Sequence, residues 1–255
     1  MTIIALTLSL CFVLFAVVLS RSFKLGLEKD VLIATLRATI QLLIIGYVLN
    51  FIFGLEQLWV VGLFLLLMIT VASLNVSKKG KSVPYMTIKV FITLVIVEIV
   101  TQALLLGFNI IPATARYIIP ISGMIIGNSM ILGSLLVTRL RSEVTLRQRE
   151  IILLLSLGGT PRQAIMPVLK SAVRSSMIPT IDGQKTLGLV QLPGMMTGQI
   201  IAGADPITAV RFQLLIVFTT MTSAIITSIL LSLFIAPSLF NKQQQLQTEP
   251  LESSS

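Results

Sequence analysis

Residues 150–180 read EIILLLSLGGTPRQAIMPVLKSAVRSSMIPT, and they form the centre of a basic segment, 139–185, in an otherwise apolar chain. An apolar run from Glu150 to Leu157 is broken by the pair Gly158–Gly159. The pair Thr160–Pro161 that follows is typical of the N-cap and first position of a helix. The sequence therefore predicts a helix, a glycine break and a second helix.

The second predicted helix has two distinct faces. Lys170 and Arg174 fall on one face, and the other face is apolar, with Ile165, Leu169, Ala172, Val173 and Met177. The whole segment carries eight basic residues: Arg139, Arg141, Arg147, Arg149, Arg162, Lys170, Arg174 and Lys185. So basic a segment between membrane spans is expected on the cytoplasmic side. It is then either a docking element for a partner or an amphipathic helix that lies on lipid.

The composition of the chain indicates an all-α polytopic membrane protein. Of its 255 residues, 55% are hydrophobic and only 11% are charged, which is outside the range of soluble domains. The net charge of +9 is no sign of nucleic-acid binding, because the basic residues lie in short loops between apolar runs. With no His and a single Cys, Cys11, the chain lacks a disulfide framework, a Cys-based metal site and the commonest acid–base catalyst.

A possible nucleotide site is rejected. Residues Gly80, Lys81 and Ser82 match the end of a phosphate-binding P-loop, but Asn75 stands where the first glycine of that motif is required. We therefore expect no ATP hydrolysis by this chain, no enzyme activity and no cofactor of its own.

Seven membrane spans are predicted. They are residues 3–19, 31–53, 58–74, 90–108, 118–137, 186–206 and 212–235, with a short interfacial helix at 21–30 and a disordered tail at 241–255. The first is read as an uncleaved span because no basic region precedes it and no cleavage site follows. With the N-terminus outside, seventeen Lys and Arg residues lie inside and only Arg116 and Arg211 outside. Residues 1–240 then form a single transmembrane domain.

Polar residues inside these spans are the candidate functional residues. Glu98 and Gln102 lie one turn apart on the fourth span, and Glu98 is either a cation or proton ligand or a hydrogen-bonded packing residue. Asn128 and Ser129 follow the small-residue pair Gly123 and Gly127, which is typical of close helix packing.

The sixth span is expected to be broken. Pro193 would free the carbonyl of Leu189, and a broken helix is tolerated only against protein or a water-filled cavity. It is therefore either a substrate path or a tightly packed kinked helix. Without His, a metal site would have to use oxygen and thioether donors. The predicted path residues are Met195, Met196, Gln199, Gln191, Asn128 and Ser129, with Glu98 as a nearby charge.

The segments LEKD (27–30), IPISGMIIGNSM (119–130), LSLGGTPRQA (155–164) and 178–206 resemble the FetB-type ABC transporter permease family, which includes an iron-export permease and plant aluminium-tolerance half-transporter subunits. The resemblance covers nearly the whole chain, although Gly159 replaces a usual alanine and Phe212 a common tyrosine. It implies a permease in the cell membrane that exports a metal ion such as iron, as a homodimer with two separate ATPase subunits that bind ATP and Mg. The implied coupling residues are Glu150, Leu157, Gly158, Gly159, Thr160, Pro161 and Arg162.

Other functions remain open at this point. The chain could export a sugar nucleotide or another small amphiphile. It could be an intramembrane enzyme, for which Glu98 and Asp205 are the remaining acidic candidates. It could also be a membrane receptor or assembly factor that transports nothing.

Overall fold

The computed structural model describes residues 3–55, 57–80, 83–241 and 243–247, with side chains from residue 8 onward. Every regular element among these residues is a helix, which confirms the all-α prediction. Lys81 and Ser82 of the rejected P-loop match, and the tail from residue 248, lie outside the described residues. The chain divides into two compact units, residues 1–57 and 58–255, and each is described by itself.

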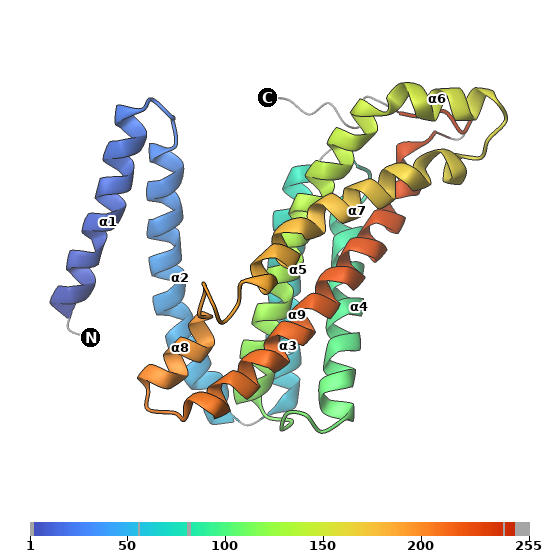
Figure 1. Ribbon diagram of the computed structural model, residues 1–255. Helices are drawn as coiled ribbons and strands as arrows, with labels where there is room; N and C mark the ends of the chain where they lie inside the picture. The colour runs from blue at the N-terminus through green and yellow to red at the C-terminus, as the bar shows by residue number, and fades with distance from the viewer. Residues whose placement is uncertain (1–2, 56, 81–82, 242, 248–255) are drawn as a thin grey trace. The chain divides into compact units, whose positions relative to one another are not determined.

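The first unit is a hairpin of two helices, α1 (Ile3–Ser22) and α2 (Glu28–Leu55), shown in blue in Figure 1. The predicted interfacial helix at 21–30 is wrong, because the connection is a tight turn. Lys24 and Gly26 both adopt positive φ there (52° and 71°), which a helix does not allow. The Ser20 hydroxyl closes the turn by donating to Glu28 Oε1 at 3.1 Å and accepting from the Leu27 N–H at 3.3 Å.

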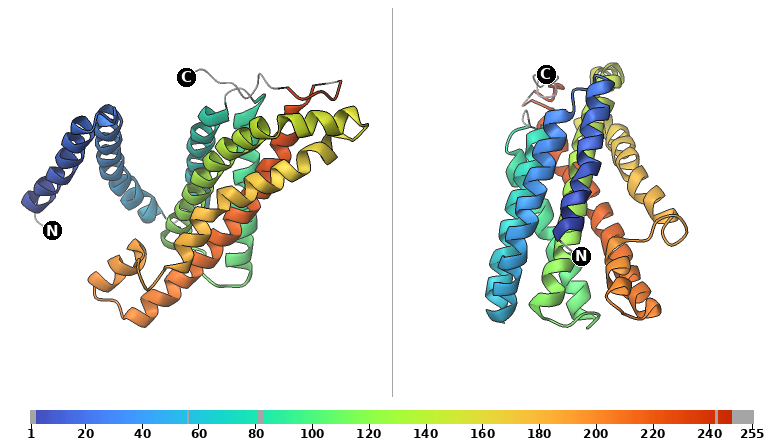
Figure 2. Two further views of the ribbon diagram at one scale, coloured as in Figure 1. Left: turned by 45° about the horizontal axis from the view of Figure 1, so that its top comes forward. Right: turned by 90° about the vertical axis from the view of Figure 1, so that its left-hand side faces the viewer.

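The second unit is a helical bundle built around α5 (Figures 1 and 2). Its long helix α5 packs against α9, α3, α7 and α4. The elements of this unit are α3 (Leu58–Ser77), η1 (Lys78–Gly80), α4 (Met86–Gly107), α5 (Ala115–Leu146), α6 (Gln148–Ser156), α7 (Pro161–Lys185), α8 (Gly194–Ile201), α9 (Pro206–Ile235) and η2 (Ala236–Leu239).

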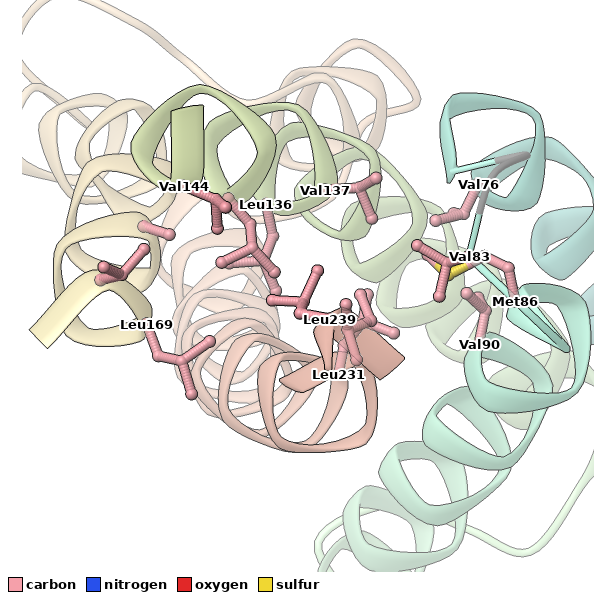
Figure 3. Packing of buried hydrophobic residues seen from close by; sticks show 14 of the residues in the cluster. Val76, Val83, Met86, Val90, Leu136, Val137, Val144, Leu169, Leu231 and Leu239 are labelled. Carbon is pink, nitrogen blue, oxygen red and sulfur yellow. The ribbon is translucent and has the colours of Figure 1, made fainter. Parts of the chain in front are cut away.

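An apolar core joins α3, α4, α5, α7 and α9 near the end of the bundle where α6 lies. Figure 3 shows its centre, where Leu136, Leu231 and Leu239 are at most 1% exposed. Small residues let the helices approach, since a Cβ on Gly133 would lie 3.4 Å from Leu231 and one on Gly123 would lie 3.3 Å from Met68. The packing expected of Gly123 is therefore present, whereas a Cβ on Gly127 would meet no atom within 4 Å, so the predicted Gly123–Gly127 pair packs closely only at Gly123.

Among the described residues, five helices are long and apolar enough to cross a membrane. They are Glu28–Leu55, Leu58–Gly80, Met86–Gly107, Ala115–Leu146 and Pro206–Leu239. Each exceeds the roughly 20 residues that a bilayer requires. The described apolar part of α1, Leu8–Ser22, is shorter.

The region of the expected sixth span differs from the prediction. Residues 186–193 form a turn instead of a kinked helix, and α8 after it has only eight residues. Gly188 adopts φ +85°, and its N–H donates to the Gln191 carbonyl at 2.9 Å. Pro193, which has no N–H to donate, is the N-cap of α8 and does not lie inside a helix.

Helix α7 extends further than the predicted loop suggests. It runs from α6 along α5 and α9, and α8 lies at the other end of the unit from α6 (Figures 1 and 2). The second half of segment 139–185 is therefore a wall of the bundle. Within the predicted sixth span, 186–206, the chain leaves the end of α7, forms the turn and continues as α8.

The C-terminal tail is ordered for longer than predicted. Phe240 and Leu246 form an antiparallel bridge, and Leu246 packs against the core. Lys89 Nζ donates to Ser238 Oγ and so ties α4 to η2. The predicted disorder from residue 241 is therefore wrong for residue 241 and for 243–247.

Candidate functional site

A polar groove with a volume of about 240 Å³ lies between α5, α7, the 187–193 turn and α9. Most of its polar lining consists of amide and hydroxyl side chains. The lining residues are Asn128, Pro179, Thr180, Gly183, Gln184, Leu187, Gln191, Pro193, Gln213, Val217 and Thr220. We call this the amide groove.

Helical spacing explains how the two longer walls of the amide groove form. Gln213, Val217 and Thr220 on α9 follow the i, i+4, i+7 pattern that places side chains on one face of a helix. Residues 180, 184 and 187 repeat this spacing along α7 and into the turn. Two polar faces thus oppose each other across the groove.

Hydrogen bonds join these walls. Asn128 Nδ2 on α5 donates to the Thr220 carbonyl at 3.3 Å, and Gln184 Nε2 on α7 donates to the Val217 carbonyl at 3.3 Å. Gln213 Oε1 is buried and has no hydrogen-bond partner among the described residues. Most buried polar atoms in proteins are paired, so this unpaired amide oxygen is an exception beside the groove.

The amide groove contains only part of the predicted path. Asn128 and Gln191 line it. Met195, Met196 and Gln199 lie on α8 and are not among its lining residues. Met195 instead packs against an apolar cluster that includes Ile121 and Ile216.

Ser129 and Glu98 lie elsewhere in the bundle. Ser129 is fully buried in α5, and its hydroxyl has no partner among the described residues. Glu98 on α4 is 5% exposed and accepts hydrogen bonds from Ser122 Oγ and, at 3.0 Å, from Gln102 Nε2. Gln102 Nε2 also donates to Ser122 Oγ at 2.7 Å. The predicted Glu98–Gln102 pair is thus present, with Ser122 as an added partner.

The Glu98 cluster and the amide groove are separate sites. Ser122 and Asn128 both lie on α5, but six residues of helix separate them by about 120° around its axis. Glu98 Oε2 and Gln102 Oε1 are buried without a hydrogen-bond partner in the described part of the chain. Glu98 is not among the groove-lining residues.

Four amide or hydroxyl residues of the lining were not predicted from the sequence: Thr180, Gln184, Gln213 and Thr220. The sequence did contain a signal for Gln213, because a glutamine inside an apolar span needs a hydrogen-bond partner at membrane depth. Gln184 was assigned to the basic loop, since Asp182 and Lys185 beside it are charged. These two charges pair with each other at 2.9 Å and remain exposed.

The donors available for a metal are weak. In the described ranges, no three His, Cys, Asp or Glu residues lie close enough together to hold a metal ion. The amide groove offers neutral amide, hydroxyl and carbonyl groups.

The hairpin of α6 and α7 is the second candidate feature. Thr160 is the N-cap of α7: its Oγ1 accepts from the Gln163 N–H at 3.3 Å, and its own N–H donates to Gln163 Oε1 at 2.9 Å. This capping box and Pro161 at the start of α7 confirm the predicted cap. Gly158 adopts φ +87°, and a Cβ on Gly159 would lie 2.7 Å from the Leu154 carbonyl oxygen. The glycine break is therefore a structural requirement.

The surface of α6 exposes apolar side chains. Ile151 is 1% exposed and anchors the helix to the core. Leu153, Leu154 and Leu157 are exposed, Leu157 by 76%, and Glu150 is also exposed. A cluster of exposed leucines on a helix held at a fixed angle is typical of an interaction surface.

Comparison with known proteins adds relatives that match over nearly their whole length. The model of the uncharacterised protein family UPF0014 matches residues 3–240. The UPF0014 membrane protein YjkA of Bacillus subtilis is 60% identical over 97% of this chain and 99% of its own. The probable iron export permease protein FetB of Escherichia coli is 36% identical over 97% and 96%. Protein ALUMINUM SENSITIVE 3 of Arabidopsis thaliana is 36% identical over 96% and 90%. No solved structure matches.

Proposed function

This chain belongs to the UPF0014 family of membrane proteins, and from that premise we propose that it is the permease subunit of an ABC transporter. A separate ATPase chain binds ATP and Mg and hydrolyses the ATP. The observation that carries the proposal is the exposed leucine surface of α6, held at a fixed angle by Gly158 and the Thr160 cap. The Escherichia coli relative, named probable iron export permease protein FetB, supports it.

In this proposal, α6 enters a cleft on the ATPase. Leu153 and Leu157 fill the cleft, and Glu150 and Arg162 lie at its rim. Residues Gly158 to Pro161 make the hairpin rigid, so a movement of the ATPase is passed to α7. Coupling in transporters requires such a rigid connection between two sites.

Helix α7 connects the coupling surface to the amide groove. Thr160 caps its first turn and Gln184 lies in its last turn. The two are 24 residues apart, which corresponds to about 36 Å of helix. A tilt of α7 would therefore shift the Gln184 wall of the groove relative to Gln213 and Thr220 on α9, and so open or close it.

The cargo is proposed to be iron or another metal, in keeping with the name of FetB. The lining of the amide groove also supports the second candidate, a sugar nucleotide or other polar solute. Hard cations prefer carboxylate ligands, and the described lining residues include none. A metal would therefore cross with its own ligands or water around it. Met195, Met196, Gln199 and Ser129 remain predicted path residues in other conformations of the bundle, with Glu98 only as a nearby charge.

The proposed topology has seven passes, with the N-terminus outside and the C-terminus inside. The five long apolar helices supply five passes. α1 supplies the first, and α7 with the turn and α8 supplies the sixth. The distribution of seventeen basic residues inside and two outside supports this orientation. Two permease and two ATPase chains form the complex in the cell membrane.

The test is copurification with the ATPase encoded next to this chain, followed by ATP hydrolysis in liposomes with a panel of iron, zinc and manganese salts, metal chelates and sugar nucleotides. We expect a stable complex whose hydrolysis is stimulated by one class of solute. Solute binding without any associated ATPase would instead support a receptor, and would refute the proposal.

A further inference from the structure

A second groove runs along the outside of the bundle between α7 and α9. It consists of two adjoining cavities of about 300 and 290 Å³ that share Met166, Leu169 and Leu233. None of its lining residues belongs to the amide groove. The first cavity is also lined by Pro161, Arg162, Ile165, Ala236, Pro237 and Phe240, and the second by Lys170, Val173, Arg174, Ile229 and Ser232. We call this the α7–α9 groove.

The walls of the α7–α9 groove are almost entirely apolar. Ile229 and Leu233 belong to the last two turns of α9, which is one of the five helices able to cross a membrane. Pro237 and Phe240 follow immediately after that helix. In the topology proposed above, on which this inference rests, the groove begins near the cytoplasmic membrane surface and continues toward the hydrocarbon, the position of a lipid acyl chain.

Three basic side chains line one flank of the groove. Arg162, Met166, Lys170 and Arg174 are spaced four residues apart on α7, so they form one row that advances about 6 Å at each step. All three basic residues are exposed. Within the described part of the chain none of them forms an ion pair. The row thus presents three uncompensated positive charges beside an apolar groove.

We propose that the α7–α9 groove binds an anionic phospholipid, with an acyl chain between α7 and α9 and the negatively charged headgroup attracted by the row of Arg162, Lys170 and Arg174. Long basic side chains extend along apolar surface and keep their charge at the headgroup level. Basic pockets between membrane helices on the cytoplasmic side are suited to anionic headgroups. A zwitterionic lipid would leave the net charge of the row unbalanced.

A second copy of this chain is a poorer occupant of the groove. A two-fold symmetric interface would place the row of Arg162, Lys170 and Arg174 against the same row of the partner. Like charges facing each other across an interface oppose association. The charge of the row therefore favours a negatively charged lipid.

The experiment is native mass spectrometry of the full-length chain, purified in detergent and supplied with phosphatidylglycerol or phosphatidylcholine. We expect the parent to retain phosphatidylglycerol with at least about a tenfold preference, because three basic groups act together. The variant R162Q/K170Q/R174Q should lose this preference. The control K78Q/K79Q/R149Q removes the same charge from exposed positions outside the groove and should keep the preference for phosphatidylglycerol. The proposal would be overturned if the parent retained both lipids equally. It would also be overturned if the control lost the preference for phosphatidylglycerol as fully as R162Q/K170Q/R174Q.

Two further variants test where the lipid lies. Met166→Trp fills the part shared by both cavities and leaves the three charges in place, so retention of phosphatidylglycerol should fall at least several-fold. Retention equal to that of the parent would refute an acyl chain in the groove. Met166→Cys in a Cys11→Ser background should form no disulfide between copies in membranes, since Cys11 is the only native cysteine. An efficient disulfide would show that a second copy fills the groove instead.

Discussion

Gln184 on α7 donates its Nε2 hydrogen to the carbonyl oxygen of Val217 on α9, at 3.3 Å. This bond crosses the amide groove at the end of α7 that is remote from α6. It joins the helix that follows the proposed coupling surface to the helix that carries Gln213. A movement of α7 driven by the ATPase would therefore have to stretch or break this hydrogen bond.

Gln213→Leu should abolish solute-stimulated ATP hydrolysis and leave the basal rate unchanged. The substitution removes a buried amide oxygen that has no partner within the protein. Because an unpaired buried polar atom costs about 1–3 kcal/mol, the thermal stability of the variant should stay equal or increase. ATPase assays in liposomes and a thermal unfolding curve measure the two effects.

Met195→Leu and Gln199→Leu provide the contrast to Gln213→Leu, since both residues lie on α8 outside the lining of the groove. Met195→Leu preserves volume and should cost less than about 1.5 kcal/mol. If the path follows α8, these two variants lose metal stimulation and Gln213→Leu keeps it. If instead Gln213→Leu loses solute stimulation and the two α8 variants keep it, the path runs through the amide groove.

Leu157→Asp and Gly158→Val should each insert in the membrane but lose coupling to the ATPase. Leu157 is exposed by 76%, so aspartate there does not disturb the core and only changes the docking surface. Gly158 has φ +87°, and valine in that conformation costs about 1–3 kcal/mol and changes the angle of α6. Ser142→Asp, at an exposed position on α5, is the control. Normal partner-stimulated hydrolysis in both variants would mean that α6 simply lies on lipid.

Ser122→Ala should lower the free energy of unfolding by about 1–3 kcal/mol, because Glu98 loses a buried hydrogen-bond donor. Glu98→Gln keeps the shape of the side chain and should leave transport within about twofold of the parent, since Glu98 lies outside the groove. Thermal unfolding and transport assays test the pair. A loss of transport in stable Glu98→Gln protein would make Glu98 a ligand or proton carrier.

Single cysteines at Ala113 and Asp205 should react with an impermeant thiol reagent added from outside, in a Cys11→Ser background. Ala113 precedes α5 and Asp205 caps α9, so both lie in connections expected to be external. Cysteines at Lys79 and Arg149 should react only after the membrane is opened. Outside labelling at Arg149 would reverse the orientation and remove the proposed docking surface from the ATPase.

Local features could be read from the sequence because residues close in the chain determine them. Thr160 and Pro161 specify the start of α7 whatever packs around it. Gly158 permits the left-handed turn that ends α6. Glu98 and Gln102 had to meet because they are four residues apart on one helix.

Contacts between distant segments required the tertiary structure. Ser122 completes the Glu98 cluster from 24 residues away, and Gln184 meets Val217 across 33 residues. Helix α3 has no apolar face distinct from the rest of its surface, so its sequence does not indicate which face turns toward a neighbour.

The sequence by itself determined the class of protein, the cap of α7 and the glycine break. Only the tertiary structure decided that α7 continues as a wall of the bundle up to Lys185. From the sequence alone, residues 180–185 are expected in water, because burying the charged side chains of Asp182 and Lys185 would cost free energy. The structure shows that these two charges pair on the exposed side of the helix while Gln184 turns inward to α9. Helical geometry separates the two faces, and packing against α5 and α9 supplies the partners that make the inward face stable.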